Sequence, residues 1–182
     1  MSEPRPAEPV KLVMSLFARQ DEWIGEALRQ LSSTCGRPDF ISAPLAFTET
    51  DYYRKEFGGA LVRRFASFEG LVRPETLPEI KIRTNAVEWL LAEGGTRRVN
   101  IDPGYLARAH LILATGKGYA HRPYLRDGIY ADLTLIYRSG GFQPLPWTYP
   151  DYAGPKLTGI LSRIREKYVL QLRGEADPAL QL

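Results

Sequence analysis

The chain has 182 residues, of which 44% are hydrophobic and 25% charged, and these proportions are typical of a globular domain. Its single cysteine, Cys35, excludes an internal disulfide, and one cysteine with two histidines is too few for a structural zinc site, so we expect no structural metal. The polar, proline-rich start and the lack of an apolar run of roughly 20 residues predict a cytoplasmic protein without a membrane partner.

The first 101 residues alternate apolar runs with helical patterns. The run Val10–Phe17 has the length of a buried strand, and Asp21 can cap a helix whose apolar residues recur every three or four positions. The predicted elements are a strand at 10–17, a helix from 21 that ends before Gly36, strands at 40–47 and 61–68, a helix at 74–93 and a strand at 97–101. This order is the βαββαβ pattern of a ferredoxin-like α+β fold, in which both helices cover one face of an antiparallel sheet.

The remaining residues predict an extension of this core. Asp102-Pro103-Gly104 is expected to form a turn or, at Asp102, a helix cap, and residues 111–115 fit either a strand or a helix. Asp127-Gly128 is a strong hairpin signal, so we expect paired strands at 119–125 and 129–137. A short strand at Phe142 and an amphipathic helix with apolar residues from Leu157 to Leu172 close the chain. The predicted organisation is a disordered tail at 1–9, one domain at 10–173 and a frayed tail at 174–182.

Positive charge is concentrated in one segment. Between Arg97 and Arg126 there are six basic residues and one acid, although the whole chain has a net charge of only +3. Such clustering can attract a phosphate-bearing partner. A solvated face that is balanced by acids from elsewhere in the chain explains the same pattern equally well.

The basic segment and the strand that follows it hold the candidate site residues. On the strand at 129–137, Tyr130, Asp132 and Thr134 are expected to share one face, opposite Ile129, Ala131, Leu133 and Leu135. Acid–base or metal-ligand roles are predicted for Asp102, His121 and Asp132, because carboxylate and imidazole groups can take up and release protons and can bind metal ions. The predicted ligand-binding residues are Arg98, Asn100, Lys117, Arg122, Tyr130 and Thr134.

Each of these residues also has a purely structural interpretation. Asp102 before Pro-Gly is typical of a turn, and a polar strand face is typical of the solvated side of an antiparallel sheet. No P-loop, dinucleotide-binding fingerprint or nucleophile elbow is present, and Gly116-Lys117-Gly118 is explained equally well as a plain loop. The density of polar and charged residues along this part of the chain is what favours a site.

Two aromatic segments are candidate contact surfaces. Tyr52-Tyr53 precedes Arg54-Lys55, and the proline-rich segment at 145–152 contains Trp147, Tyr149 and Tyr152. Aromatic rings with basic neighbours can stack on the bases of single-stranded nucleic acid. Rings that anchor loops to the core are the favoured interpretation, and a protein partner at the Tyr52-Tyr53 and Trp147–Tyr152 loops is a further alternative.

Five runs in a fixed order resemble a known family: TDYYRKEFG at 50–58, RRVNIDPGYL at 97–106, LILATGKGYAHRPYL at 111–125, DGIYADLTLIYR at 127–138 and PWTYPDY at 146–152. With EPVKLVMSLFA at 8–18, they make the chain similar to a bacterial domain of unknown function, DUF family 4416, over about residues 8–172. The resemblance implies no activity, cofactor or catalytic residue. The GTP-binding label that some members carry is not supported by these residues, because no Asn-Lys-x-Asp motif is present.

The sequence therefore predicts a protein that binds a phosphate-containing ligand, either a nucleotide or RNA, on the surface of residues 97–134. A phosphate-directed hydrolase or transferase that uses Asp102, His121 and Asp132 is the first alternative. A non-catalytic interaction module that uses the aromatic loops is the second.

Overall fold

The computed structural model describes residues 1–47, 57 and 59–175. In this part of the chain, nine strands form one antiparallel sheet with four α-helices and one 3₁₀ helix, which confirms the predicted α+β class. The strands are β1 (Val10–Ala18), β2 (Pro38–Ile41), β3 (Leu45–Phe47), β4 (Leu61–Val72), β5 (Val99–Leu106), β6 (His110–Thr115), β7 (Tyr124–Arg126), β8 (Ile129–Arg138) and β9 (Gly141–Pro144). The helices are α1 (Asp21–Cys35), η1 (Pro74–Thr76), α3 (Leu77–Leu90), α4 (Pro150–Ala153) and α5 (Pro155–Leu172). The predicted Tyr52-Tyr53 contact loop lies outside the described residues.

Strand β1 lies inside the sheet, whose neighbours run in the order β2-β4-β1-β5-β6-β8-β7. Strand β3 also pairs with β4, and β9 pairs with β8. In the antiparallel register of β1, Leu16 lies opposite Arg64 of β4 and Ile101 of β5. All nine residues of β1 are buried, which explains why this strand reads as an almost unbroken apolar run.

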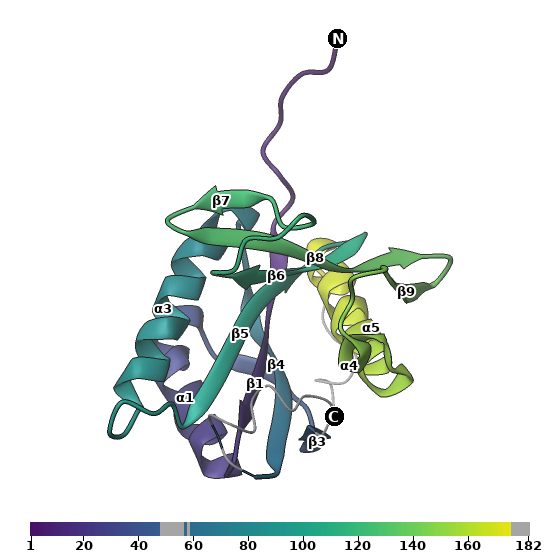
Figure 1. The fold of residues 1–182 in the computed structure, drawn as a ribbon. Helices are drawn as coiled ribbons and strands as arrows, with labels where there is room; N and C mark the ends of the chain where they lie inside the picture. Colours follow the sequence, from purple (N-terminus) through teal and green to yellow (C-terminus); the bar gives the residue numbers. More distant parts are fainter. Residues whose placement is uncertain (48–56, 58, 176–182) are drawn as a thin grey trace.

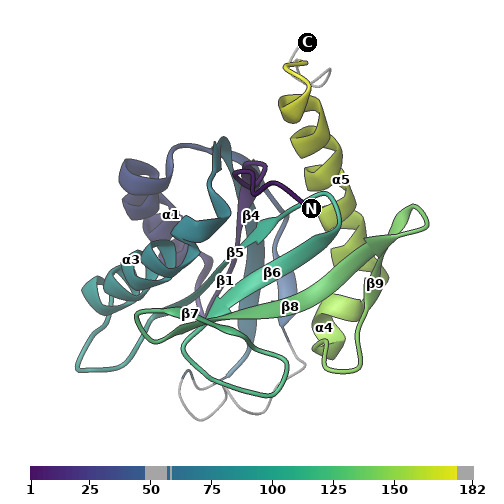
Figure 2. The same ribbon diagram turned by 90° about the horizontal axis from the view of Figure 1, so that it is seen from above.

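Helices cover both faces of the sheet (Figures 1 and 2). On one face, Leu12 and Leu16 of β1 belong to a core with Ile24 of α1 and residues of α3. On the other face, Val13 belongs to a second core with Leu161 and other residues of α5. Alternate residues of one strand therefore serve two separate cores. Among the described residues, no helix has both the length and the apolar composition needed to cross a bilayer.

The tight hairpins that join β7 to β8 and β8 to β9 are specified by their local sequences. Asp127 and Gly128 both have positive φ angles, of 54° and 75°, and Ser139 and Gly140 have φ angles of 52° and 82°. Two consecutive positive φ angles are the signature of the type I′ turn, which matches the twist of the strands it joins. The predicted hairpin across Asp127-Gly128 is confirmed, with a first strand that starts at Tyr124 instead of residue 119.

The structure corrects the predicted turn at Asp102-Pro103-Gly104, because all three residues lie inside β5. The backbone N–H and C=O of Ile101 point away from β1 toward α3, so by strand alternation the position of Pro103 faces the same way. Proline is tolerated there because β6 pairs with β5 only from Gly104 onward. Residues 111–115, which fitted strand or helix, belong to strand β6.

Two further strand predictions were wrong in detail. The expected strand at 40–47 consists of two short strands, β2 and β3, which both pair with β4. In β8, Leu135 packs in the core under α5, whereas Ile129 packs against Leu77 of α3, so these two residues do not share a face. A shift in the register of β6 and β8 between Leu111 and Ile112 adds one residue to β8 and reverses its alternation.

Candidate functional site

A cavity opens where β5 and β6 separate. The two strands pair only at their shared end, from Gly104 opposite Leu113 to Leu106 opposite Leu111, and beyond this point β6 and β8 turn away from β5 (Figure 1). The first half of β5 therefore lacks a neighbouring strand on one side. Helix α3 supplies the missing partners: Glu88 Oε1 accepts a hydrogen bond from the N–H of Ile101 at 2.6 Å, and Lys81 Nζ donates to its carbonyl at 2.9 Å.

The cavity has a volume of about 680 Å³, which is within the usual range for small-ligand pockets. Five basic and four acidic side chains line it among the described residues, together with several aromatic rings. The lining residues are Phe17, Phe47, Arg63, Lys81, Asn85, Glu88, Arg97, Asn100, Asp102, Leu113, Ala114, Thr115, Gly116, Lys117, Arg122, Asp132, Tyr149, Asp151 and Tyr152.

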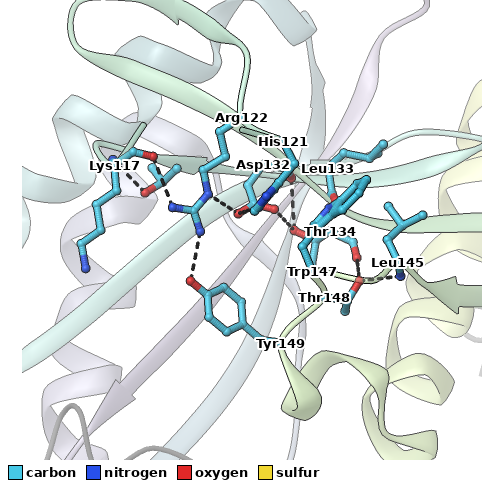
Figure 3. Close-up of polar contacts among 11 residues, drawn as sticks. Lys117, His121, Arg122, Asp132, Leu133, Thr134, Leu145, Trp147, Thr148 and Tyr149 are labelled. Carbon is cyan, nitrogen blue, oxygen red and sulfur yellow. Dashed lines mark hydrogen bonds and ion pairs between the residues drawn. The ribbon is translucent and has the colours of Figure 1, made fainter. Parts of the chain in front are cut away.

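Arg122 organises the wall formed by β8 and the loop after β6. Its Nε donates to Asp132 Oδ2 at 2.7 Å, its Nη1 to the carbonyl of Lys117 at 3.3 Å and its Nη2 to the hydroxyl of Tyr149 at 3.0 Å (Figure 3). These three bonds engage three of the five N–H donors of the guanidinium. Arg122 thereby ties the 116–118 loop, strand β8 and the segment before α4 into one wall.

The segment before α4 is fixed to β8 by two side chains. Trp147 Nε1 donates to the carbonyl of Leu133 at 2.8 Å, and Thr148 Oγ1 donates to the carbonyl of Thr134 at 2.5 Å. Both carbonyls lie at the point where the register of β8 shifts. The extra residue in β8 therefore receives partners from a loop instead of a strand, and Tyr149 is held at the cavity (Figure 3).

The opposite wall is a chain of polar side chains that starts at Arg97, just before β5, and continues along β5. Arg97 Nη1 donates to Asn100 Oδ1 at 2.9 Å, and Asn100 Nδ2 donates to Asp102 Oδ2 at 2.8 Å. Lys81 Nζ lies 3.7 Å from Asp102 Oδ1. Burial raises the pKa of the Glu88 carboxyl, although the charges of Lys81 and Arg97 oppose this shift.

Arg63 of β4 lies between these walls and is only 5% exposed. It forms an ion pair with Asp151 and donates from Nε to Ser15 Oγ at 2.7 Å. Its guanidinium carbon also lies within 4.8 Å of the ring centroids of Phe47, Phe65 and Tyr152. Because Asp151 already neutralises Arg63, this buried part of the cavity is not a strong anion site.

A family model for a domain of unknown function, DUF4416, matches residues 8–168. The chain belongs to the DUF4416 family. The matched range includes every residue that lines the cavity. A search of curated proteins and a search of solved structures found no match.

The structure brings five of the candidate residues of this DUF4416 protein into one cavity: Asn100, Asp102, Lys117, Arg122 and Asp132. His121 lies behind them, with its ring stacked on Trp147 at 5.0 Å and its Nε2 3.6 Å from Asp132 Oδ2, which is too long for a hydrogen bond. Arg98, Tyr130 and Thr134 do not line the cavity. Arg98 instead pairs with Glu93, and the hydroxyl of Thr134 donates to the carbonyl of Asp132.

The expected excess of positive charge is balanced locally. Every arginine between residues 97 and 126 forms an ion pair with a carboxylate, and the pairs are Arg97–Glu88, Arg98–Glu93, Arg108–Glu8, Arg122–Asp132 and Arg126–Glu79. A site in this region is therefore defined by the cavity instead of by net charge. Among the described residues, no group of three or more His, Cys, Asp or Glu side chains is placed to hold a metal ion.

Sequence reasoning missed the contributions of α3 and α4. Lys81 and Glu88 lie on the buried stripe of α3 with Leu77 and Thr84, at helical spacing. Charged residues on a buried stripe are unusual without a partner, and this pattern was the available signal. Arg63 and Asp151 carried no such signal, because their pairing depends on two segments 88 residues apart.

Proposed function

We propose that this protein binds a small phosphate-containing ligand, best represented by a nucleotide, in the cavity between β5 and β6. One observation carries the proposal: polar side chains from β5, β8, α3 and the 116–118 loop converge on a single cavity of about 680 Å³. This volume suits a mononucleotide better than a folded RNA. The absence of a bilayer-spanning helix among the described residues is compatible with the cytoplasmic location that we propose.

The phosphate end of the ligand is assigned to the 116–118 loop. Lys117 is exposed at the cavity, and its backbone N–H donates to Thr115 Oγ1 at 3.1 Å, which shapes the loop. Arg122 holds this loop in place and has N–H donors beyond its three bonds to described residues. The apolar and aromatic lining near Phe17, Leu113 and Tyr152 supports placement of a flat base deeper in the cavity.

Calorimetry with adenosine 5′-monophosphate, uridine 5′-monophosphate and ribose 5-phosphate tests this function. Lys117→Glu is expected to weaken nucleotide binding by about tenfold or more, because a charge-assisted hydrogen bond is replaced by repulsion. Lys156→Glu is the matched control, since Lys156 is an exposed lysine in the first turn of α5 and does not line the cavity. Equal affinities for both variants, or no binding by the unmodified protein, would contradict the proposal.

Hydrolysis or transfer at phosphate is the second candidate, favoured by the presence of Asp102 and Asp132 in the same cavity. Binding is preferred over catalysis because Asp132 Oδ2 already accepts a hydrogen bond from Arg122 Nε and is therefore occupied by a structural partner. His121 also stops short of a hydrogen bond to Asp132. A non-catalytic partner at the Trp147–Tyr152 loop is the remaining alternative.

We also infer a ferredoxin-like core in the sheet. The order β2-β4-β1-β5 and the two helices α1 and α3 on one face support this assignment. Strands β6 to β9 then extend the core, and the cavity lies at the junction of core and extension.

A further inference from the structure

Exposed aromatic rings gather beside the cavity. In the part of the chain that the structure describes, Tyr119 is 71% exposed, Tyr124 58%, Tyr149 49% and Trp147 39%. Large rings that stay this exposed do little for the core, and exposed apolar groups that cluster commonly mark a contact surface. Packing alone therefore does not explain where these rings lie, and their clustering favours contact with a binding partner.

Ring contacts connect three of the aromatic side chains in this region, Tyr119, His121 and Trp147. Tyr119 meets the edge of the His121 ring at 5.4 Å, and His121 stacks on Trp147 at 5.0 Å with an interplanar angle of 13°. Tyr124 and Tyr130 form a separate pair, in edge contact at 5.2 Å. We define the aromatic strip as Tyr119, His121 and Trp147.

The backbone holds Tyr119 in a defined place. The N–H of Arg122 donates to the carbonyl of Tyr119 at 3.0 Å, and the two residues form an isolated β-bridge. On the same tight turn, Arg122 reaches Asp132 and Tyr149 at the cavity wall (Figure 3). Tyr119 is thereby joined through Arg122 to the cavity wall, and it follows the cavity-lining Lys117 by two residues.

We propose that the ligand is one nucleotide of a single-stranded nucleic acid, and that the aromatic strip stacks the base next to the nucleotide in the cavity. This inference rests on the proposed function. Single strands expose the flat faces of their bases, and proteins bind them with aromatic rings beside basic side chains. A peptide partner would not need a nucleotide-sized cavity next to the rings, so the observations favour a nucleic acid strand.

Fluorescence anisotropy with labelled single-stranded RNA and DNA of about ten nucleotides tests this inference. We expect the protein to bind at least one type of single strand more tightly than it binds the mononucleotides. A duplex of the same sequence should bind far more weakly than the single strand, because its bases are already stacked. Tyr119→Ala should weaken strand binding by about tenfold and leave the affinity for adenosine 5′-monophosphate unchanged. Comparison of the RNA and DNA affinities identifies which type of single strand the protein binds.

Trp89→Ala is the matched control, because Trp89 is 70% exposed on α3 and does not line the cavity. It should change neither affinity. The inference is overturned if strands bind no more tightly than mononucleotides, or if Tyr119→Ala and Trp89→Ala have the same effect. Mononucleotide binding that is lost in Lys117→Glu but insensitive to Tyr119→Ala would leave the proposed function standing, so the two failures can be told apart.

Discussion

At the scale of single residues, the described part of the chain holds a fully buried lysine. Lys11 of β1 is 0% exposed and donates to Asp39 Oδ2 at 2.5 Å and to Gln171 Oε1 at 2.7 Å. Burial lowers the pKa of Lys11, and the hydrogen bond and charge of Asp39 oppose that shift. This network joins β1, the edge strand β2 and helix α5 on the side of the sheet that α5 covers.

The Lys11–Asp39 pair predicts a specific response to acid. Burial alone would raise the pKa of Asp39, but hydrogen bonds from Lys11 and Ser67 and the charges of Lys11 and Lys167 lower it below 3.8. A carboxyl with a depressed folded pKa contributes stability above its unfolded pKa and loses that contribution as the pH falls through the folded value. Asp39→Asn should therefore reduce the free energy of unfolding by about 3 kcal/mol at pH 7, and the difference should shrink below about pH 4.

Urea denaturation from pH 7 to pH 2 measures this difference. Asp127→Asn is the control, because the Asp127 side chain is 53% exposed and asparagine tolerates its positive φ angle. It should stay within about 0.5 kcal/mol of the unmodified protein. A constant penalty for Asp39→Asn down to pH 2 would show that shape, not charge, accounts for the effect.

At the scale of elements, the separation of β5 from β6 creates the site. Helix α3 makes this possible, because Glu88 and Lys81 satisfy the backbone of Ile101 where β6 has turned away. The two strands meet again at Gly104, where an added Cβ would lie 2.3 Å from the carbonyl oxygen of Ile112 and 2.7 Å from Leu113 Cδ2. Glycine is therefore required at the apex of the cavity by close backbone approach.

Gly104→Ala is expected to destabilise the protein by about 1–3 kcal/mol, because the backbone of β6 must shift to admit the methyl group. Gly70→Ala in β4 is the matched control, since an added Cβ at Gly70 meets nothing within 4 Å. Chemical denaturation of both variants gives the comparison. Equal stability of the two variants would mean that β5 and β6 do not approach each other as closely as described.

Sequence patterns predicted the elements better than their junctions. The run at β1, the periodicity of α1 and α5 and the Asp127-Gly128 hairpin are local signals, and each produced the expected element. Pro103 misled the prediction because a proline in a strand is acceptable only where one side lacks a partner, and that condition is set by tertiary structure. The cavity also exists because one side of β5 lacks a strand partner, which is set by tertiary structure. The sequence therefore predicted five lining residues individually, but not the contributions of Lys81, Glu88, Arg63 and Asp151.

At the scale of the whole molecule, one sheet combines a packed core with the candidate site. Its core strands pack between α1 and α3 on one face and α5 on the other, and its extension supplies β8 and the loops that complete the cavity. Each arginine between residues 97 and 126 is paired with a carboxylate, so the proposed binding would depend on shape and directed hydrogen bonds more than on long-range attraction. We therefore expect affinity for a nucleotide to depend only modestly on salt.

Mapping of amide chemical shifts in the isotope-labelled protein during titration with adenosine and uridine 5′-monophosphates tests the central claim most directly. The account predicts shifts that saturate together at residues 100–102, 115–118, 132 and 149–152, and no shift at Lys11 or Asp39, which lie outside the cavity. The absence of any saturable shift, or shifts confined to residues away from the space between β5 and β6, would contradict it.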